Sequence, residues 1–480
     1  MANLIDNQIV RTRFAPSPTG YLHIGGLRTA LYSYLLAKQN GGQFILRLED
    51  TDMKRYVPEA AEAIFRGLKW AGLKYDEGPD IGGPFAPYIQ SQRLKLYQKY
   101  AQELIDKNLA YFCFCDEKTL EEMRQEQIAK KQAPKYDRRC LKLSPKEIEN
   151  KIKSGIPYVI RMKIPENREI VVNDIIRGKI IYKSDELDDQ VILKSDGYPT
   201  YHLAVVVDDH EMKISHVTRT EEWLPSTPKH ILLYEYFGWK PPFWAHLPLL
   251  LNPDRTKMSK RKGDIAVDDY INKGYLPDAM INYLAFLGWN PGGEKKSEKK
   301  EMAEIKEKEI YSLEELIKDF RLEKVHKAGA VFNIEKLNWY NSYYIKQMPL
   351  EELVKNCILY LKKAGLISET KNLSKKEEEK IKKIVALEQE RLEYLSQIAE
   401  DSILFFKTIS YEKSLLRWQK MTDEQIKKSL LTAKKIIAEI PDKEFTLKNI
   451  KSILLAEAEL YKNRGELLWP LRVALSGQKK

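Results

Sequence analysis

Residues 13–26 read RFAPSPTGYLHIGG, and this stretch decides the fold of the first half of the chain. It begins within a short apolar run at 9–14, which we predict to be a β-strand. Two prolines then stiffen a turn, and a predicted helix runs from 23 to 39, with two glycines in its first turn. The backbone N–H groups and the positive dipole end of that helix suit a phosphate. Because the chain lacks a GxGxxG fingerprint and a P-loop, a dinucleotide site or a Walker-type site is not supported.

The neighbouring sequence alternates short apolar strands with amphipathic helices, which is typical of a parallel α/β sheet. Between residues 111 and 189 this alternation breaks into short β-like runs and a helix rich in Lys and Glu, so we interpret the stretch as an insertion. After about residue 268 the pattern is almost wholly helical and fits an α-helical bundle. We predict strands at 43–48, 191–193 and 201–207, and helices at 58–73, 91–107 and 226–237.

Composition narrows the class of protein. The 480 residues suggest about three domains, and 43% hydrophobic with 31% charged residues is globular rather than disordered. The net charge of +11 favours a polyanionic partner such as a nucleic acid or a membrane surface without choosing between them. Four cysteines are too few for a disulfide scaffold, and we find neither a signal peptide nor a membrane span. We therefore expect a cytoplasmic protein without a membrane partner.

A second segment, KMSKRKGD at 257–264, places four cations within six residues of a predicted loop. Such a loop suits a pyrophosphate group. Taken alone, it also fits a solvated basic loop, and the HIGG segment at 23–26 alone also fits a helix start without a ligand. Because both segments occur in one chain, a nucleotide site becomes the better interpretation.

Ordered blocks of sequence resemble class I aminoacyl-tRNA synthetases, and more narrowly bacterial glutamyl-tRNA synthetases. The match runs over nearly the whole chain and is strongest up to about residue 269. Such ordered blocks are very improbable by chance. The blocks are APSPTG at 15–20 with HIGG at 23–26, RLEDTD at 47–52, GYPTYHLA at 197–204, RTEEW at 219–223 and KMSKR at 257–261.

The resemblance implies a Rossmann-like α/β catalytic domain of the class I synthetase type. An inserted α+β domain that binds the tRNA acceptor end interrupts it, and an all-α anticodon-binding region follows. We expect the catalytic halves at 1–110 and 191–268, the insertion at 111–190, a stem-contacting helical region at 269–320 and the anticodon-binding helices at 321–480.

The resemblance also implies the reaction of a glutamate–tRNA ligase. L-Glutamate attacks ATP, which Mg²⁺ accompanies, to give glutamyl-adenylate and pyrophosphate, and the glutamyl group then passes to the 3′ end of tRNA(Glu). The sequence leaves open whether tRNA(Gln) is charged as well. No protein nucleophile is needed, because the substrate carboxylate is one, so catalysis rests on positioning and on charge stabilisation. We expect a monomer.

Matched positions imply the nucleotide site. The implied catalytic residues are His23, Lys257 and Lys260, which bind the phosphates and stabilise departing pyrophosphate. The implied ATP-binding residues are His23, Gly25, Gly26, Glu222, Leu250, Lys257, Met258, Ser259, Lys260 and Arg261.

The glutamate site implied by the resemblance needs cations for two carboxylates and an anion for the ammonium group. Arg13 and Arg219 are the cations, Glu49 is the anion, and Tyr201 adds a hydrogen bond. An internal Arg–Glu ion pair is the alternative. Where the family usually has Asn after the block at 197–204, this chain has a valine, so one substrate contact is lost or replaced. The implied glutamate-binding residues are Arg13, Ala15, Ser17, Glu49, Tyr201 and Arg219, and the departure is at Val205.

Cys113, Cys115 and Cys140 match a zinc knuckle of some family members. Those members supply a fourth ligand two residues later, where this chain has Lys142, a poor ligand when protonated. The cysteines therefore either bind zinc with another fourth ligand or remain buried thiols. The other candidates for a fourth ligand are water, Tyr136 and Asp137.

In the C-terminal half, Arg391 falls near the position where the family reads the last anticodon base, and an exposed helical arginine is the alternative. The chain ends earlier than most family members, which indicates either a truncated chain or a naturally short end.

Three other proteins share parts of the pattern. The enzyme that glutamylates queuosine in tRNA resembles only the catalytic half. Glutaminyl-tRNA synthetase carries C-terminal β-barrels, whereas this C-terminal half has a helical pattern. An inactive RNA-binding protein derived from a synthetase is the alternative of a different class, and the intact His23, Lys257 and Lys260 argue against it.

Overall fold

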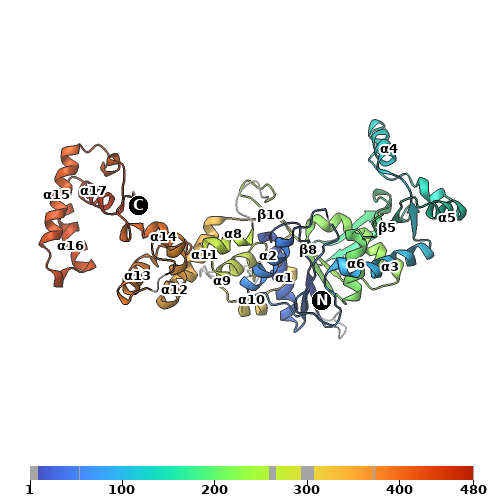
Figure 1. The fold of residues 1–480 in the computed structure, drawn as a ribbon, viewed down its shortest axis with the longest axis horizontal. Helices are drawn as coiled ribbons and strands as arrows, with labels where there is room; N and C mark the ends of the chain where they lie inside the picture. Colours follow the sequence, from blue (N-terminus) through green and yellow to red (C-terminus); the bar gives the residue numbers. More distant parts are fainter. Residues whose placement is uncertain (1–8, 53, 259–265, 293–307, 371–372, 479–480) are drawn as a thin grey trace, which may run out of the picture. The chain divides into compact units, whose positions relative to one another are not determined.

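The structure, a computed structural model, divides into two compact units, residues 1–344 and 345–480, which are described separately (Figure 1). The domain boundaries predicted within these units stay predictions. The residues that the structure describes are 9–52, 54–258, 266–292, 308–370 and 373–478.

The first unit is built on a parallel β-α-β start, as predicted. Strand β1 (Arg11–Phe14) leads through helix α1 (Ile24–Gln39) to strand β2 (Gln43–Leu46), and the two strands pair in parallel. Strand β8 (His216–Thr220) lies on the other side of β1, where the Ser215 amide donates to the Arg11 carbonyl at 2.9 Å. Most of α1 is buried, so this helix is a central part of the core.

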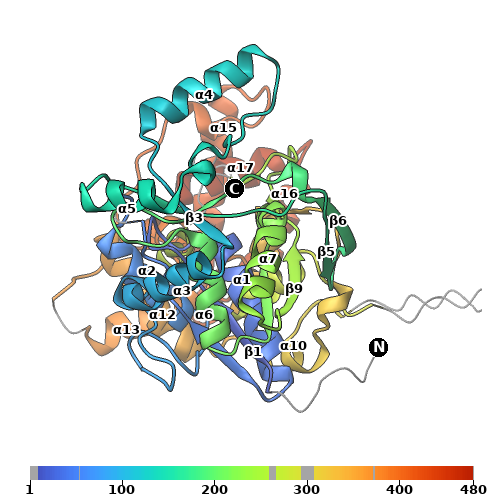
Figure 2. The ribbon, with the colours of Figure 1, turned by 90° about the vertical axis from the view of Figure 1, so that its right-hand side faces the viewer.

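Strand β8 is one edge of a four-stranded sheet. Strand β9 (Phe243–Leu247) pairs with β8 in parallel, and β5 (Glu169–Asp174) meets β9 where Asp174 pairs with Trp244. Strand β6 (Gly178–Lys183) forms an antiparallel hairpin with β5 beside β9 (Figure 2). The strand order is β8-β9-β5-β6, so part of the predicted insertion belongs to the same sheet as β8 and β9.

Helices pack against this sheet through apolar stripes. In α3 (Leu94–Asp106), Tyr97, Ala101 and Leu104 recur at helical spacing and are buried. The same core includes residues of α6 (Tyr201–Glu211). The other helices of this unit outside the insertion are α2 (Pro58–Trp70), α7 (Thr227–Phe237), α8 (Val267–Lys273), α9 (Pro277–Ala285) and α10 (Leu313–Asp319). Helix α11 (Ile334–Gln347) runs across the boundary at residue 344.

Two strand predictions require correction. Residues 201–207 form the first turns of α6 and not a strand. The prediction was wrong because this helix is buried from Leu203 to Asp209, so its sequence lacks the alternation of apolar and polar residues that would reveal a helical period. Residues 191–193 do form a strand, β7, but it pairs antiparallel with β4 (Val159–Met162) rather than resuming the parallel sheet. Strands β8 and β9 were missed.

The insertion carries its own three-stranded sheet of β3 (Ala110–Cys113), β4 and β7. Helix α4 (Glu117–Ala129) begins at Asp116, whose side chain accepts the amide of Thr119. Helix α5 (Pro145–Lys153) begins with a capping box. A two-residue strand, β10 (Leu250–Leu251), pairs with β11 (Ala330–Val331) outside this sheet.

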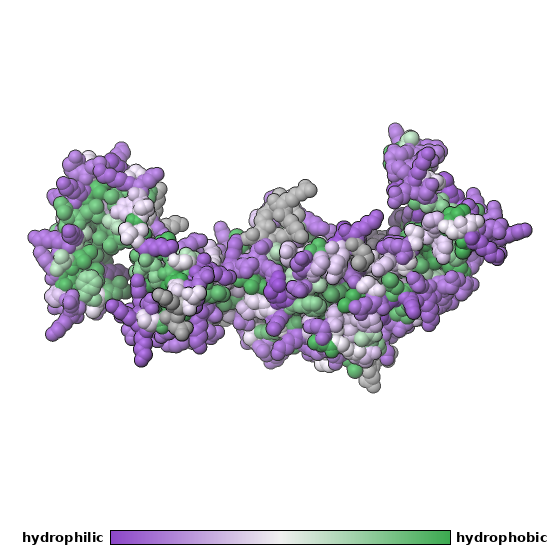
Figure 3. All heavy atoms as spheres, viewed as in Figure 1, coloured by the Kyte–Doolittle hydropathy of each residue, from purple (hydrophilic) through white to green (hydrophobic). Residues whose placement is uncertain are grey.

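The second unit is helical in its described residues, which confirms the all-α prediction. Its surface is largely hydrophilic, with apolar side chains exposed around α15 to α17 (Figure 3). In the part of the chain that the structure describes, no helix is long and apolar enough to cross a membrane. The helices are α12 (Leu350–Lys363), α13 (Lys375–Glu388), α14 (Gln397–Asp401), α15 (Asp423–Glu439), α16 (Leu447–Ala458) and α17 (Gly465–Ser476).

Candidate active site

A cavity of about 960 Å³ opens where β1 and β8 end and where α1 and α6 begin. In open α/β sheets, ligands bind at this carboxyl edge of the strands. The cavity brings together the predicted glutamate-site residues and the first-turn glycines of α1. The predicted residues that line it are Arg13, Ala15, Ser17, Gly25, Gly26, Glu49, Tyr201 and Arg219.

One wall of the cavity rests on a buried cluster of charges. Arg47, fully buried, lies 2.9 Å from an Asp209 carboxylate oxygen and 3.1 Å from Glu49 Oε1. The Arg13 Nε atom donates to Asp209 Oδ1 at 3.1 Å. The predicted alternative of an internal Arg–Glu ion pair is therefore present, but the pair is Arg47–Glu49, and Arg13 pairs with an aspartate. These mutual contacts fix the side chains that face the cavity.

Burial and the neighbouring arginines shift the pKa values of Glu49 and Asp209 in opposite directions. Burial raises the pKa of Glu49 to about 7, although the charges of Arg47 and Arg13 oppose it. Burial also acts on Asp209, but the two arginines outweigh it and hold its pKa below the ordinary value. An arriving ammonium group would therefore find Glu49 close to its point of ionisation and would stabilise the charged form.

Arg219 differs from Arg13 in its hydrogen-bond partners. Its Nε donates to His246 Nε2 at 3.0 Å, and its Nη2 donates to Thr227 Oγ1 at 2.9 Å. Its Nη1 donates to the Tyr201 hydroxyl at 3.1 Å. Among the described residues no carboxylate lies within 4.0 Å of this guanidinium. Burial lowers the pKa of Arg219, and no described acidic side chain pairs with this cation.

Several residues of the predicted nucleotide site lie close together at the start of α1. His23 caps the helix by accepting the Gly25 amide at 2.8 Å. A Cβ on Gly25 would lie 3.1 Å from His23 Nδ1 and 3.8 Å from Leu250 Cδ1, so these three residues adjoin. Met258, whose amide donates to the Leu250 carbonyl at 3.2 Å, extends this group.

Of the basic segment at 257–264, the structure describes residues 257 and 258. Lys257 forms an ion pair with Glu222, so two predicted ATP-site residues contact each other. Ser259, Lys260 and Arg261 lie outside the described residues. Five of the predicted ATP-site residues adjoin the cavity through these contacts but do not line it. They are His23, Glu222, Leu250, Lys257 and Met258.

Several residues of the site were not predicted as such. Arg47 lies within the RLEDTD block, which was available as a signal. Asp209, which contacts Arg47, and His246, which contacts Arg219, are brought to the site only by the fold. Trp223 lines the cavity, with its ring 4.0 Å from that of Tyr201. Val205, the departure from the family pattern, is buried in the core of α6 and does not line the cavity.

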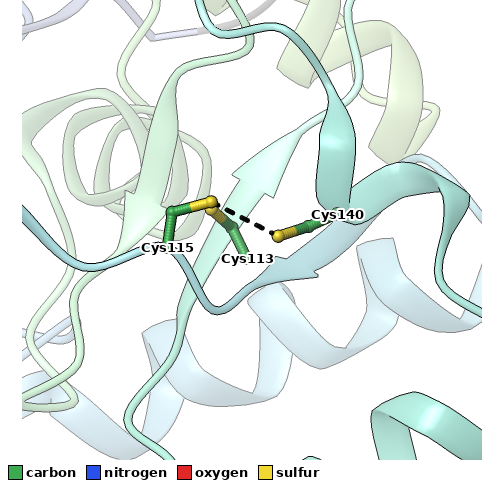
Figure 4. Close-up of side chains that lie close together, drawn as sticks. All are labelled: Cys113, Cys115 and Cys140. Carbon is green, nitrogen blue, oxygen red and sulfur yellow. Dashed lines mark hydrogen bonds between the residues drawn. The ribbon is translucent and has the colours of Figure 1, made fainter. Parts of the chain in front are cut away.

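The three clustered cysteines meet in the insertion (Figure 4). Their Sγ atoms all lie within 4.8 Å of one another, and those of Cys115 and Cys140 are 3.6 Å apart. The Tyr136 hydroxyl lies 3.3 Å from Cys113 Sγ and 3.4 Å from Cys115 Sγ, whereas Lys142 is exposed. A hydrogen bond from the Cys140 thiol lowers the pKa of Cys113 against the effect of burial. The cluster therefore favours a thiolate, the form that binds metals.

Arg391 lies in a turn after α13 and not in a helix, which corrects the alternative weighed for it. Its side chain is 71% exposed and lies 3.8 Å from a Glu388 carboxylate oxygen. The guanidinium is therefore accessible to a polyanion.

Comparison with known protein families identifies the class to which the chain belongs. Residues 9–339 match the family of class I tRNA synthetases (E and Q), catalytic domain, and residues 351–480 match an anticodon-binding domain. The chain therefore belongs to the class I tRNA synthetases.

Relatives narrow the family further. A glutamate–tRNA ligase from Chloroherpeton thalassium is 48% identical over 98% of this chain and 93% of its own length. The crystal structure of a glutamate tRNA ligase from Elizabethkingia meningosepticum in complex with its amino acid is 39% identical, with a TM-score of 0.80 over 98% of this chain and 94% of that one. A glutamate-tRNA synthetase structure from Elizabethkingia anophelis is 40% identical, with a TM-score of 0.81 over 98% and 95%. This chain belongs to the glutamate–tRNA ligase family.

Proposed function

We propose that this chain activates L-glutamate with ATP and transfers the glutamyl group to the 3′ end of tRNA(Glu). The observation that carries the proposal is Arg219, a buried cation that faces a cavity at the strand ends and has no carboxylate partner among the residues that the structure describes. A dicarboxylic amino acid supplies the missing anion. Arg13 supplies a second cation, and Glu49 accepts the ammonium group.

In the first step, a glutamate carboxylate oxygen attacks the α-phosphorus of ATP. The bond to the bridging oxygen breaks, and pyrophosphate leaves with the electron pair. Positive groups near the start of α1 lower the barrier by stabilising charge on the phosphates. Mg²⁺ bound to ATP adds charge neutralisation and needs no protein cage. The proposed phosphate-binding residues are His23, Lys257 and Lys260.

We propose zinc as a structural ion of the insertion, held by Cys113, Cys115 and Cys140, with the Tyr136 oxygen as the fourth ligand. Tetrahedral zinc with bonds of about 2.3 Å to sulfur separates its sulfur ligands by about 3.8 Å. The 3.6 Å between Cys115 Sγ and Cys140 Sγ fits this geometry. Lys142 stands at the position where some family members have the fourth ligand, and in this chain Tyr136 takes over that role.

Metal analysis tests the zinc proposal. The protein purified without chelator is expected to carry one zinc per chain, and Cys140→Ser is expected to lose it. Cys357→Ser is the matched control, because Cys357 is buried in α12 and lies outside the cluster. A wild-type chain that stays metal-free after incubation with excess zinc contradicts the proposal.

The proposed macromolecular partner is tRNA(Glu), contacted by the insertion at its acceptor end and by Arg391 near the anticodon. We propose a cytoplasmic monomer. Whether tRNA(Gln) is also charged depends on anticodon contacts, and parallel charging assays with the two purified tRNAs separate the two cases.

ATP–pyrophosphate exchange tests the function. We expect exchange with glutamate only when tRNA is present, and none with glutamine. Exchange with glutamate in the absence of tRNA would favour an enzyme of the queuosine-modifying type. Folded protein that shows no exchange with any amino acid and tRNA combination would favour the inactive RNA-binding alternative.

A further inference from the structure

Behind Arg219 lies a buried chain of polar side chains that reaches the inserted hairpin. His246 Nδ1 lies 2.6 Å from Asp174 Oδ2, and His246 Nε2 lies 3.0 Å from Arg219 Nε. On the other side, His230 Nδ1 lies 3.2 Å from Arg219 Nη1, and His230 Nε2 lies 3.1 Å from His202 Nδ1. Asp174, His230 and His246 are buried, so water does not replace these contacts.

The donors of Arg219 dictate where the imidazole protons lie. A guanidinium N–H only donates, so His246 Nε2 must carry a lone pair and the proton must be on Nδ1. That proton points at Asp174 Oδ2, which also accepts the His246 amide at 3.0 Å. His230 follows the same rule, since its Nδ1 accepts from Arg219 and its Nε2 donates to His202. The contacts thus require neutral imidazoles in single tautomers.

Burial keeps these rings neutral at physiological pH. It lowers the pKa of His202 to about 3 and the pKa of His230 well below its ordinary value. It also lowers the pKa of His246, although the Asp174 carboxylate opposes it. Neutral acceptors hold the guanidinium in place without cancelling its charge. The contrast is Arg13, which shares its charge with the Asp209 carboxylate at 3.1 Å.

We propose that Asp174 and His246 are positioning residues for glutamate recognition. Asp174 fixes the His246 tautomer, His246 Nε2 fixes the Arg219 guanidinium, and the uncancelled charge of Arg219 then binds a glutamate carboxylate. This inference rests on the proposed function. It adds to the site two residues that do not line the cavity, one of them on the inserted strand β5.

The isosteric change Asp174→Asn tests the proposal. An amide N–H facing His246 Nδ1 favours the opposite tautomer, which points an N–H at Arg219 and removes an acceptor. We expect the glutamate KM to rise about 10- to 100-fold, with the ATP KM within about twofold of wild type. Glu77→Gln is the matched control, because it makes the same exchange at a buried carboxylate that pairs with Arg11 outside this chain of contacts.

A double-mutant cycle separates tautomer control from a general structural effect. In His246→Gln, the amide oxygen accepts from Arg219 whatever lies at position 174, so adding Asp174→Asn should leave the glutamate KM unchanged within about twofold. Thermal melts confirm that each variant folds. An equal rise in KM caused by Asp174→Asn in both backgrounds overturns the proposal, as does a wild-type KM in the single variant.

Imidazole ¹⁵N chemical shifts give a readout that does not depend on activity. We expect the His246 proton on Nδ1 in the wild type and on Nε2 in Asp174→Asn. A His246 proton on Nε2 in the wild type overturns the inference. If the tautomers are as expected but the wild type shows no glutamate-dependent exchange, the proposed function fails and the positioning of Arg219 stands.

Discussion

The cavity of the first unit and the surface of the second unit hold their charges in opposite ways. In the first unit, Arg47 is buried together with Asp209 and Glu49 and contacts both. In the second, ion pairs such as Lys382–Glu351 lie at the surface, with side chains 50% and 70% exposed. A small charged substrate needs a site whose charges are already fixed, whereas a long polyanion needs charges that it can reach.

The energetic cost differs accordingly. Removing Asp209, the carboxylate that both Arg13 and Arg47 contact, would leave buried cations short of an anion, which costs about 3–5 kcal/mol. An exposed pair contributes only about 0–1 kcal/mol, because water and salt screen it. The comparison therefore predicts that equal substitutions in the two units have very unequal effects.

The largest effect is expected for Arg219→Lys. Lysine keeps the charge but loses the planar fork that bonds to His246, Tyr201 and Thr227 together. The glutamate KM should rise about 100-fold in aminoacylation at saturating tRNA. Arg417→Lys, at an exposed pair of the second unit, is the control and should change nothing measurable. If Arg219→Lys and Arg417→Lys changed the glutamate KM equally, the contrast between buried and exposed charges would be wrong.

The next largest effect is expected for Glu49→Gln. This change should weaken glutamate binding about 10-fold or more at pH 8. It should also raise the free energy of unfolding at that pH. Because burial raises the pKa of Glu49 from an ordinary value near 4.5 to about 7, its favourable contribution is complete below pH 4.5 and is lost as pH rises through 7. Removing the charge should therefore gain about 1–3 kcal/mol at pH 8 and little at pH 4.5.

Thermal melts at the two pH values, with calorimetric titration of glutamate, check this prediction. Glu351→Gln, in an exposed pair, is the control. A Glu49→Gln variant less stable at pH 8 than the wild type would show that the ionised carboxylate stabilises the cluster.

A smaller effect is expected for Arg391→Ala. Its guanidinium is exposed and pairs only at 3.8 Å with Glu388, so the folded state should lose less than about 0.5 kcal/mol. The KM for tRNA should rise about 3- to 10-fold, with the glutamate KM unchanged. Arg464→Ala, at another exposed position of the same unit, should leave the tRNA KM unchanged. A tRNA KM unaffected by Arg391→Ala excludes the anticodon role.

The smallest effect is expected for Lys382→Gln. The pair with Glu351 joins α13 to α12 across 2.8 Å, but its exposure limits it to about 0.5 kcal/mol. Chemical unfolding of the single and double variants with Glu351→Gln measures the coupling. A coupling above about 2 kcal/mol would show that this surface is as preorganised as the catalytic cavity.

The sequence predicted the parts of the molecule that local chemistry determines. Residues 13–26 carry a strand, a proline turn and a capped helix start in one stretch, so the sheet edge and much of the cavity could be foreseen. Residues 201–207 could not, because a helix buried on most sides has no amphipathic period and its valines favour a strand. Asp174 and His246 were missed since nothing in the sequence shows that β5 lies beside β9.

The position of β1 in the sheet also imposes an order of events on synthesis. One neighbour of this strand, β2, lies about thirty residues downstream, and the other, β8, lies about two hundred residues downstream. At 5–20 residues per second, a ribosome needs on the order of ten seconds or more to deliver β8. During that interval one edge of β1 is unpaired and open to unwanted strand addition. The nascent chain therefore exposes this strand edge before the cavity exists.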